Sequence, residues 1–232
     1  MIVYTQDGNA RIRTAQPATG TPHTLVDLSV TDPHESDVDF ILFAFDSALP
    51  YLASIGSAAQ WGTILFSTTP KRVQGFTDFV QVSYDLHSRP IQDGAAWQHM
   101  GIYEIKTKDG QWTRVAAQGL SISIPSYVPE QLAGKDMREA TDYLYLNYLI
   151  ADRRKGHLAK GAAAQLVAYA DGQAKQMNKA VFYSDCWRGN NDGLLRYYQS
   201  LGFSPIGLFD VPDKHGPGLP WTGYLFSKPV PQ

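Results

Sequence analysis

The chain has 232 residues, 44% of them hydrophobic, which is enough for a sizeable core in one or two domains. Lys and Arg number 20 against 22 Asp and Glu, and the net charge of −2 gives no indication of a nucleic-acid-binding surface. The single cysteine excludes an internal disulfide, and no apolar run has the length of a signal peptide or a membrane span. We therefore expect a cytoplasmic protein without a membrane or nucleic-acid partner.

The first half of the chain is predicted to mix strands with one helix. Alternating residues predict a strand over 10–15, and the Pro- and Thr-rich residues 16–37 are predicted to be loop with one short strand at 24–30. Apolar residues three and four apart predict a helix over 37–55, which Pro50 should end or kink. Further strands are expected at 64–66, 79–84, 97–106 and 112–124, the last two joined by a turn at Asp109-Gly110.

The second half is predicted to alternate between strands and helices. Its elements are expected in the order strand 142–151, helix 160–178, strand 180–187, helix 192–201, strand 204–210, loop 212–220 and strand 224–227. The sequence has no internal repeat and no obvious linker. It therefore predicts one α+β domain over residues 1–232, with a parallel or splayed pair of strands in its second half.

A basic turn joins the strand at 142–151 to the helix that follows it. Residues 152–163 combine Arg and Lys with glycines, directly before a helix whose first N–H groups have no partner within the helix. Such a turn suits a phosphate or pyrophosphate, because the helix dipole favours negative charge and glycine allows close backbone approach. The turn lacks the P-loop and dinucleotide-binding patterns, so a basic surface turn that caps a helix is an equal alternative.

A second motif lies downstream of the turn, at residues 190–203. Asn191 is followed seven residues later by Tyr198, and four residues further by Gly202-Phe203. This spacing resembles the second signature of the GNAT superfamily of N-acetyltransferases. Arg153 and Gly156 resemble the family's (Arg/Gln)-x-x-Gly-x-(Gly/Ala) loop for coenzyme A, and the strand at 10–15 resembles its opening strand. The firm resemblance covers residues 143–209.

The loop motif departs from the family pattern at one position. Leu158 stands where the family has Gly or Ala, whereas Gly161 and Ala163 offer a second register for the small residues. The resemblance therefore implies that the whole run from Arg153 to Ala163 contributes to the cofactor site.

The resemblance implies a GNAT-like acyl-CoA N-acyltransferase fold, with a mixed, mostly antiparallel sheet, a splayed parallel strand pair and flanking helices. It also implies transfer of an acetyl group from acetyl-CoA to the primary amine of a small molecule, by direct attack in a ternary complex. Residues 131–232 would bind the cofactor, and residues 1–130 would shape the acceptor site of a monomer or homodimer. A protein or peptide N-acetyltransferase and a non-catalytic CoA-binding module are the alternatives.

By the same resemblance, residues of the strand, the turn, the following helix and the second motif bind acetyl-CoA. They are Leu149, Ile150, Ala151, Arg153, Arg154, Lys155, Gly156, His157, Lys160, Gly161, Ala162, Ala163, Asn191 and Tyr198. Asn191 is equally interpreted as a helix N-cap.

Tyr198 matches the family's general acid, which protonates the leaving thiolate, although a core tyrosine is the simpler alternative. The base is not fixed by the motif. Asp185 and Glu104 are the preferred candidates, ahead of His99, Tyr143 and Tyr145. Cys186 is more simply a small buried residue than a nucleophile.

The acceptor site is expected to include Gln60, Trp61 and Tyr145. The turn at 56–62 lies where the family's first two helices meet, and the loop at 212–220, followed by Trp221, is a candidate lid. The scattered histidines have no metal-ligand spacing, so no metal is expected.

Overall fold

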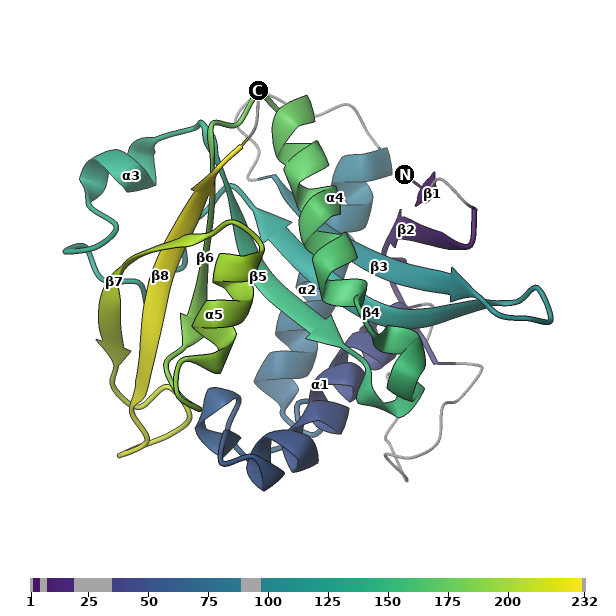
Figure 1. Cartoon of the computed structure of the whole chain (residues 1–232), viewed down its shortest axis with the longest axis horizontal. Coiled ribbons are helices and arrows are strands. Elements are labelled where there is room, and N and C mark those ends of the chain that lie inside the picture. Colours follow the sequence, from purple (N-terminus) through teal and green to yellow (C-terminus); the bar gives the residue numbers. More distant parts are fainter. Residues whose placement is uncertain (1, 5–7, 19–34, 89–96, 231–232) are drawn as a thin grey trace. The chain divides into compact units, whose positions relative to one another are not determined.

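The computed structural model describes residues 2–4, 8–18, 35–88 and 97–230, which divide into two compact units (Figure 1). The first unit lies within residues 1–51, 64–119 and 148–166, and the second within 52–63, 120–147 and 167–232. Residues 1–130 and 131–232 each contribute to both units. The expected boundary between an acceptor-site half and a cofactor-binding half therefore does not coincide with the boundary between the units. The strand expected at 24–30 lies outside the described residues.

Eight strands form a mixed, mostly antiparallel sheet in the order β1-β2-β3-β4-β5-β6-β8-β7. Their bounds are β1 Ile2–Tyr4, β2 Ala10–Thr14, β3 Gln98–Lys106, β4 Trp112–Ser121, β5 Tyr143–Ala151, β6 Val181–Trp187, β7 Ser204–Val211 and β8 Trp221–Pro229. The chain passes from one unit to the other within β4 and β5. The predicted fold class is thereby confirmed.

The first unit contains β1, β2 and β3, and β2 pairs antiparallel with both β1 and β3. The predicted alternation in β2 is present, because Ala10, Ile12 and Thr14 are buried while the arginines between them are half-buried. Helix α1 spans Asp37–Ser54 and continues past Pro50 for one further turn. The helix predicted at 37–55 is therefore confirmed, and Pro50 does not end it.

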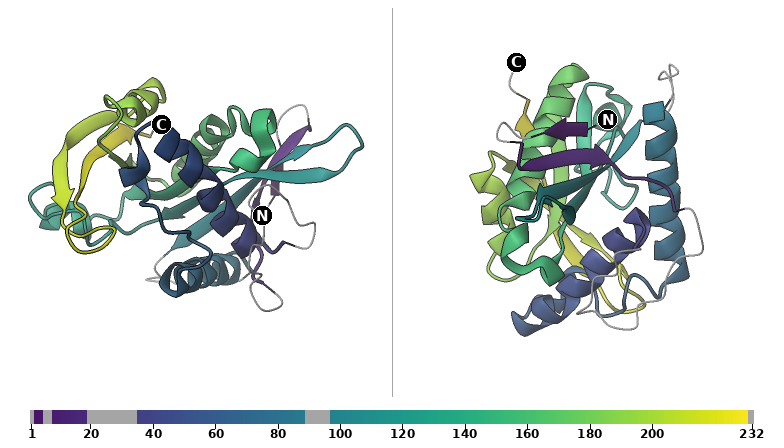
Figure 2. Two further views of the ribbon diagram at one scale, coloured as in Figure 1. Left: turned by 90° about the horizontal axis from the view of Figure 1, so that it is seen from below. Right: turned by 90° about the vertical axis from the view of Figure 1, so that its right-hand side faces the viewer.

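Helix α2 spans Pro70–Ser88, so the strand predicted at 79–84 is wrong. Buried side chains at Phe76, Val80 and Ser83 follow the helical period, whereas Val82 between them is exposed. The proline is tolerated at the first helical position, because its missing N–H would have no partner there. Figures 1 and 2 show α2 beside β3, against which it packs. The other predicted short strand, 64–66, is irregular.

The second unit contains the parallel strand pair. β5 pairs with β6 from Tyr143↔Val181 to Leu146↔Ser184, and β6 stays paired with β8 as far as Trp187↔Gly223. The parallel register thus ends while both strands continue, which is the predicted splay. β8 pairs antiparallel with β7 and starts at Trp221, earlier than the predicted 224.

The remaining helices are short or lie in the second half of the chain. α4 (Ala162–Gln176) and α5 (Gly193–Ser200) confirm the two predicted helices, whereas α3 (Lys135–Glu139) was not predicted. Two 3₁₀ segments, η1 and η2, occupy Ala58–Gln60 and Arg153–Ala159. Within the described ranges, no helix combines the length and apolar character needed to cross a bilayer.

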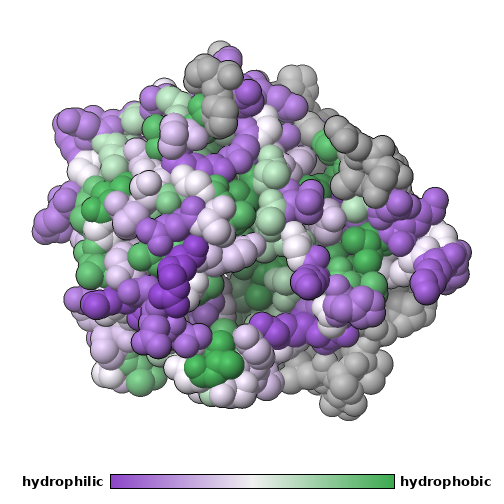
Figure 3. Space-filling view, in the orientation of Figure 1, coloured by the Kyte–Doolittle hydropathy of each residue, from purple (hydrophilic) through white to green (hydrophobic). Residues whose placement is uncertain are grey.

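Hydrophilic and hydrophobic residues are interspersed over the face in view in Figure 3. The large hydrophobic side chains that are exposed come from many different segments: Val3, Tyr51, Ile55, Ile64, Val82, Leu158, Tyr197, Ile206, Leu208 and Leu219.

Candidate active site

The basic turn belongs to the first unit and begins where β5 ends. Asp152 is fully buried, its N–H donates to the Val115 carbonyl at 2.9 Å, and its carboxylate accepts from the Arg154 N–H at 3.0 Å. The 3₁₀ segment is interrupted at Gly156, which has φ 54° and ψ −125°, and Gly161 has φ 81°. Because this backbone region favours glycine, the two glycines determine how the turn enters α4.

Arg154 is held inside the unit. Its guanidinium lies 2.9 Å from Asp152 and 2.8 Å from Glu35, and its side chain is only 2% exposed. Burial lowers the pKa of the guanidinium, but the two carboxylates outweigh burial and raise it overall. Arg154 therefore fixes the turn to a residue that is distant in sequence, so its charge is already compensated within the protein.

The other basic side chains of the turn differ from Arg154. Arg153 is exposed, its N–H donates to the Ser47 hydroxyl at 3.1 Å, and its guanidinium carbon lies 3.2 Å from the Tyr51 ring centroid. His157 and Lys160 are exposed, while Lys155 is half-buried with a pKa lowered by desolvation. A methyl group added at Gly156 or Gly161 would meet nothing within 4 Å.

These features leave open space beside two glycines, three lysine or arginine side chains and the start of a 15-residue helix. Such an arrangement suits an anion, so the residues fit a pyrophosphate group. The expected cofactor-binding residues from Leu149 to Ala163 all lie in this unit, whereas Asn191 and Tyr198 lie in the second unit.

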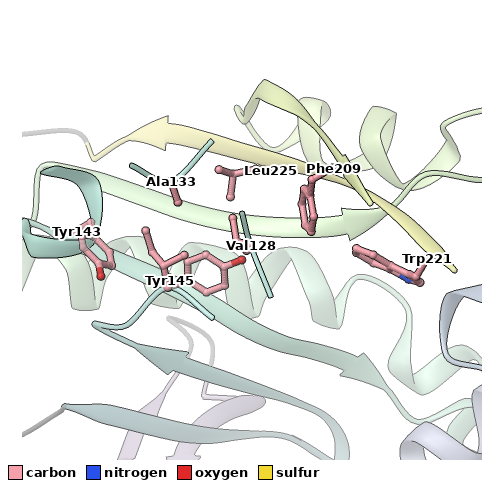
Figure 4. Close-up of a cluster of buried hydrophobic side chains, with 8 residues drawn as sticks. Val128, Ala133, Tyr143, Tyr145, Phe209, Trp221 and Leu225 are labelled. Atoms are coloured by element: carbon pink, nitrogen blue, oxygen red, sulfur yellow. The ribbon is translucent and has the colours of Figure 1, made fainter. Parts of the chain in front are cut away.

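The second unit holds a cluster of buried aromatic and aliphatic side chains that packs on one face of its strands (Figure 4). Strand alternation places Tyr143, Tyr145 and Asn147 on the same face of β5, and Tyr183 and Asp185 on the matching face of β6. Phe209, Trp221 and Leu225 extend the face over β7 and β8.

Asp185 is the carboxylate of this face. Its Oδ1 accepts hydrogen bonds from the Tyr127 hydroxyl at 2.9 Å and from the Tyr145 hydroxyl. The residue remains partly exposed, yet burial of the carboxylate among rings raises its pKa. The hydrogen bond from Tyr145, the charge of Lys214 and the hydrogen bond from Tyr127 act in the opposite direction. Asp185 can therefore accept a proton more readily than a surface aspartate while staying within reach.

Lys214 is the cation whose charge lowers the pKa of the Asp185 carboxylate. Its Nζ lies 3.3 Å from the Tyr127 ring centroid and 4.6 Å from that of Trp221, and the side chain is half-buried. Burial lowers the pKa of the ammonium group, and the charge of Asp185 partly restores it. The charged form is thus held between aromatic faces.

Tyr198 lies on α5, 8% exposed, with the ring centroids of Phe203 and Phe226 at 5.7 and 4.6 Å. Burial is the main cause that raises the pKa of its hydroxyl, followed by the nearby Cys186 and Asp185. Tyr198 consequently keeps its proton at neutral pH. The pKa of the buried Cys186 thiol is raised to about 12, chiefly by desolvation, so a thiolate nucleophile is not favoured there.

Asn191 precedes α5 in a run of left-handed residues. Asn190, Asn191 and Asp192 have φ values of 50°, 51° and 58°, and Asp192 rather than Asn191 takes the N-cap position. The alternative interpretation of Asn191 as an N-cap is therefore not supported by the backbone. The Asn191 carbonyl accepts a hydrogen bond from the Arg196 guanidinium.

The expected acceptor-binding residues Gln60, Trp61 and Tyr145 all belong to the second unit. The carbonyl of Gln60 accepts from the indole N–H of Trp221 at 3.3 Å, which ties η1 to the start of β8. Tyr145 is fully buried and reaches Asp185, whereas Trp61 is half-buried. The structure thus associates the predicted turn with the aromatic face.

The other candidate bases have different surroundings. Glu104 is buried on β3 and forms ion pairs with Arg11 at 2.5 Å and Arg13 at 2.9 Å, so its charge is compensated in the first unit. His99, also on β3, is fully buried with a pKa lowered to about 3, chiefly by desolvation. Tyr143 lies on the aromatic face, with its pKa raised by burial.

Sequence reasoning missed Tyr127 and Lys214. Tyr127 follows Pro125 in an irregular segment, and Lys214 lies in the Pro- and Gly-rich loop before Trp221. Neither position belongs to a motif. The sequence signal that could have indicated Lys214 is the Pro- and Gly-rich loop at 212–220, which was a candidate lid of the acceptor site. Among the described residues, no three His, Cys, Asp or Glu side chains are grouped so that they could hold a metal ion.

No protein-family model matches the chain, and the curated proteins contain no relative recognisable from sequence. Solved structures do resemble it. yncA from Salmonella typhimurium, a proposed acetyltransferase solved with its cofactor acetyl-CoA, is 13% identical with a TM-score of 0.55, covering 97% of this chain and 95% of that one. A proposed phosphinothricin N-acetyltransferase is 14% identical, with a TM-score of 0.51 and coverages of 96% and 99%.

A GNAT-family acetyltransferase from Listeria monocytogenes is 18% identical, with a TM-score of 0.50 and coverages of 81% and 85%. At these identities the likeness concerns the fold. The chain therefore has the fold of the GNAT acetyltransferases.

Proposed function

We propose that the protein is an N-acetyltransferase that transfers the acetyl group of acetyl-CoA to a primary amine of a small molecule. The observation that carries the proposal is Asp185, a reachable carboxylate of raised pKa, in the same unit as the protonated hydroxyl of Tyr198. A base and an acid whose environments keep their proton affinities apart are what acetyl transfer to an ammonium group needs.

The basic turn supports the donor side of the proposal. Arg153, Lys155 and Lys160 would hold the pyrophosphate of acetyl-CoA, together with the N–H groups at the start of α4. Arg154 would act indirectly, because its ion pairs with Asp152 and Glu35 fix the turn. When bound, acetyl-CoA supplies the thioester carbon that the amine attacks and the thiolate that leaves.

Asp185 would receive the proton that the amine loses. An alkyl ammonium group has a pKa near 10.4, so its deprotonation near neutral pH costs about 4 kcal/mol, and a base that takes the proton removes part of this barrier. The new C–N bond forms as the C–S bond breaks. The nitrogen loses a second proton as the amide forms. Tyr198 would give its hydroxyl proton to the leaving sulfur and take up this second proton from the nitrogen, so that the products are the amide, the CoA thiol and protonated Asp185.

The first experiment is a calorimetric titration with acetyl-CoA and with CoA as a control. Micromolar binding at one site supports the donor site. Arg153→Ala should weaken it, whereas Lys175→Ala, which removes an exposed positive charge elsewhere on the chain, should not. Equal affinities in these two variants would remove Arg153 from the donor site.

The second experiment measures release of the CoA thiol with a panel of amines. Tyr198→Phe should lower kcat by roughly a hundredfold or more while the dissociation constant for acetyl-CoA stays within about twofold, as expected for loss of a general acid. Unchanged turnover would exclude Tyr198 from the reaction. Binding of acetyl-CoA without amine-dependent thiol release would instead indicate a non-catalytic CoA-binding module, and acetylation of peptides alone would indicate a protein N-acetyltransferase.

A further inference from the structure

We propose that Lys214 binds a carboxylate of the acceptor, so that the amines acetylated by this protein are amino acids or other small amino carboxylic acids. This inference deepens the proposed function and depends on it. It rests on Tyr127, which contacts both Lys214 and Asp185, and on the hydrogen bonds that fix the loop carrying Lys214.

Lys214 carries a positive charge that no ion pair in the described part of the chain compensates. Salt bridges to a carboxylate within 4.0 Å are formed by Lys228 and Lys135, but not by Lys214. Its ammonium group is instead placed over the rings of Tyr127 and Trp221. A half-buried ammonium group that contacts rings and has no carboxylate of the described residues within 4.0 Å is available for an anionic partner.

The same side chains connect Lys214 to Asp185. Tyr127 donates its hydroxyl hydrogen to Asp185 at 2.9 Å while its ring faces the Lys214 ammonium at 3.3 Å. One tyrosine therefore contacts a negative group through its hydroxyl and a positive group through its ring. An α-amino acid has the complementary pair of charges, with its amine toward Asp185 and its carboxylate toward Lys214.

The loop that carries Lys214 is fixed on both sides of this residue. The carboxylate of Asp213 accepts from the Gly218 N–H at 2.6 Å, the His215 ring is 3.1 Å from the Ala59 carbonyl, and Trp221 bonds to Gln60. Left-handed φ values of 56° at Asp213 and 72° at Gly218 allow the turn. A preorganised cation loses little conformational freedom when a ligand binds, which favours specificity.

A third polar group faces the same side. The Oδ1 atom of Asn147 is buried and has no hydrogen-bond partner in the described residues, and strand alternation places Asn147 on the face of Tyr145. A buried amide oxygen of this kind normally has a partner, and an amine N–H of the acceptor would supply one.

The inference is tested with matched acceptors that differ only in the carboxylate. The pairs are phenylalanine with phenethylamine and leucine with isopentylamine, assayed for CoA thiol release in wild type, Lys214→Met and Lys214→Arg. Each acceptor is compared between enzymes, so that differences in its own amine pKa cancel. Lys175→Met, at an exposed lysine of α4 in the same unit, is the control variant.

We expect Lys214→Met to lower kcat/KM for the amino acids by about tenfold to a hundredfold, as for loss of a hydrogen bond between charged groups. The decarboxylated amines should change less than about threefold, and Lys214→Arg should restore part of the loss. Equal effects on both members of a pair would overturn the inference and leave the acetyltransferase proposal intact. Failure of every amine to release thiol in the wild type would overturn both.

Discussion

The fall of kcat/KM at low pH, the acidic limb of the pH profile, tests whether Asp185 is the base. Tyr145→Phe is the substitution whose effect on the pKa of Asp185 has the most certain direction. Burial raises the pKa of Asp185, while the hydrogen bond from Tyr145 is the largest of the contributions that lower it. Removal of this hydroxyl should raise the pKa of Asp185 further. The base acts only when ionised, so kcat/KM should fall at a higher pH in the variant than in the wild type.

The expected size of the shift follows from the hydrogen bond that is lost. A hydrogen bond to a charged group is worth about 1.5–3 kcal/mol, and one pKa unit corresponds to about 1.4 kcal/mol. Asp185 is partly exposed and keeps its bond from Tyr127 at 2.9 Å, so the lower end of the range applies. We expect the acidic limb to move upward by about one pH unit. The phenyl ring retains most of the buried volume, and the fold should tolerate the change.

The assay is the pH dependence of kcat/KM, measured by thiol release at saturating acetyl-CoA. Tyr224→Phe is the matched control, because the Tyr224 hydroxyl also bonds to a carboxylate of the second unit, that of Asp192 at 3.2 Å. Its acidic limb should coincide with that of the wild type. An unmoved limb in Tyr145→Phe, or a limb that persists in Asp185→Asn, would show that another group is the base.

Two further predictions concern stability. Arg154→Met should lower the free energy of unfolding in urea by about 3–5 kcal/mol, because it leaves the buried Asp152 carboxylate without its ion pair and Glu35 with the longer ion pair to Arg114 at 3.5 Å. A loss below about 1 kcal/mol, typical of surface pairs, would contradict the burial of this network. Gly223→Ala should displace the Trp221 ring, since a methyl group there would lie 2.2 Å from it. The change should lower the free energy of unfolding by about 1–3 kcal/mol and alter the near-ultraviolet circular dichroism spectrum. An unchanged spectrum would refute the predicted displacement.

The second half of the fold could be predicted because its local signals agree with one another. Strands β5 and β6 are rich in aromatic residues, with three leucines in β5, and the helix after the basic turn is rich in alanine. The turn chemistry also helped, since Gly202 follows α5 as a helix stop with φ 91°. In this region, periodicity, propensity and turn residues all specify the same elements.

Helix α2 could not be identified because its buried side is narrow and its sequence locally alternates. Phe79-Val80-Gln81-Val82-Ser83-Tyr84 places apolar and polar residues in a pattern compatible with a strand, although only Val80 and Ser83 are fully buried. Packing against β3 decides in favour of the helix. Such packing is a tertiary effect that a window of six residues does not contain.

The candidate site also depends on tertiary contacts that the sequence motif does not contain, as its charged side chains show. Arg153 and Arg154 are adjacent in the basic turn and both were expected to bind the cofactor, yet Arg154 is compensated by Glu35, which lies 119 positions away, whereas Arg153 is exposed. Lys214 belongs to no motif, and its proposed role depends on rings contributed by Tyr127 and Trp221. The availability of a cation for a ligand is therefore decided by which carboxylates the fold brings to it. This is why the motif predicts where a phosphate could bind but does not identify the group that would select the acceptor.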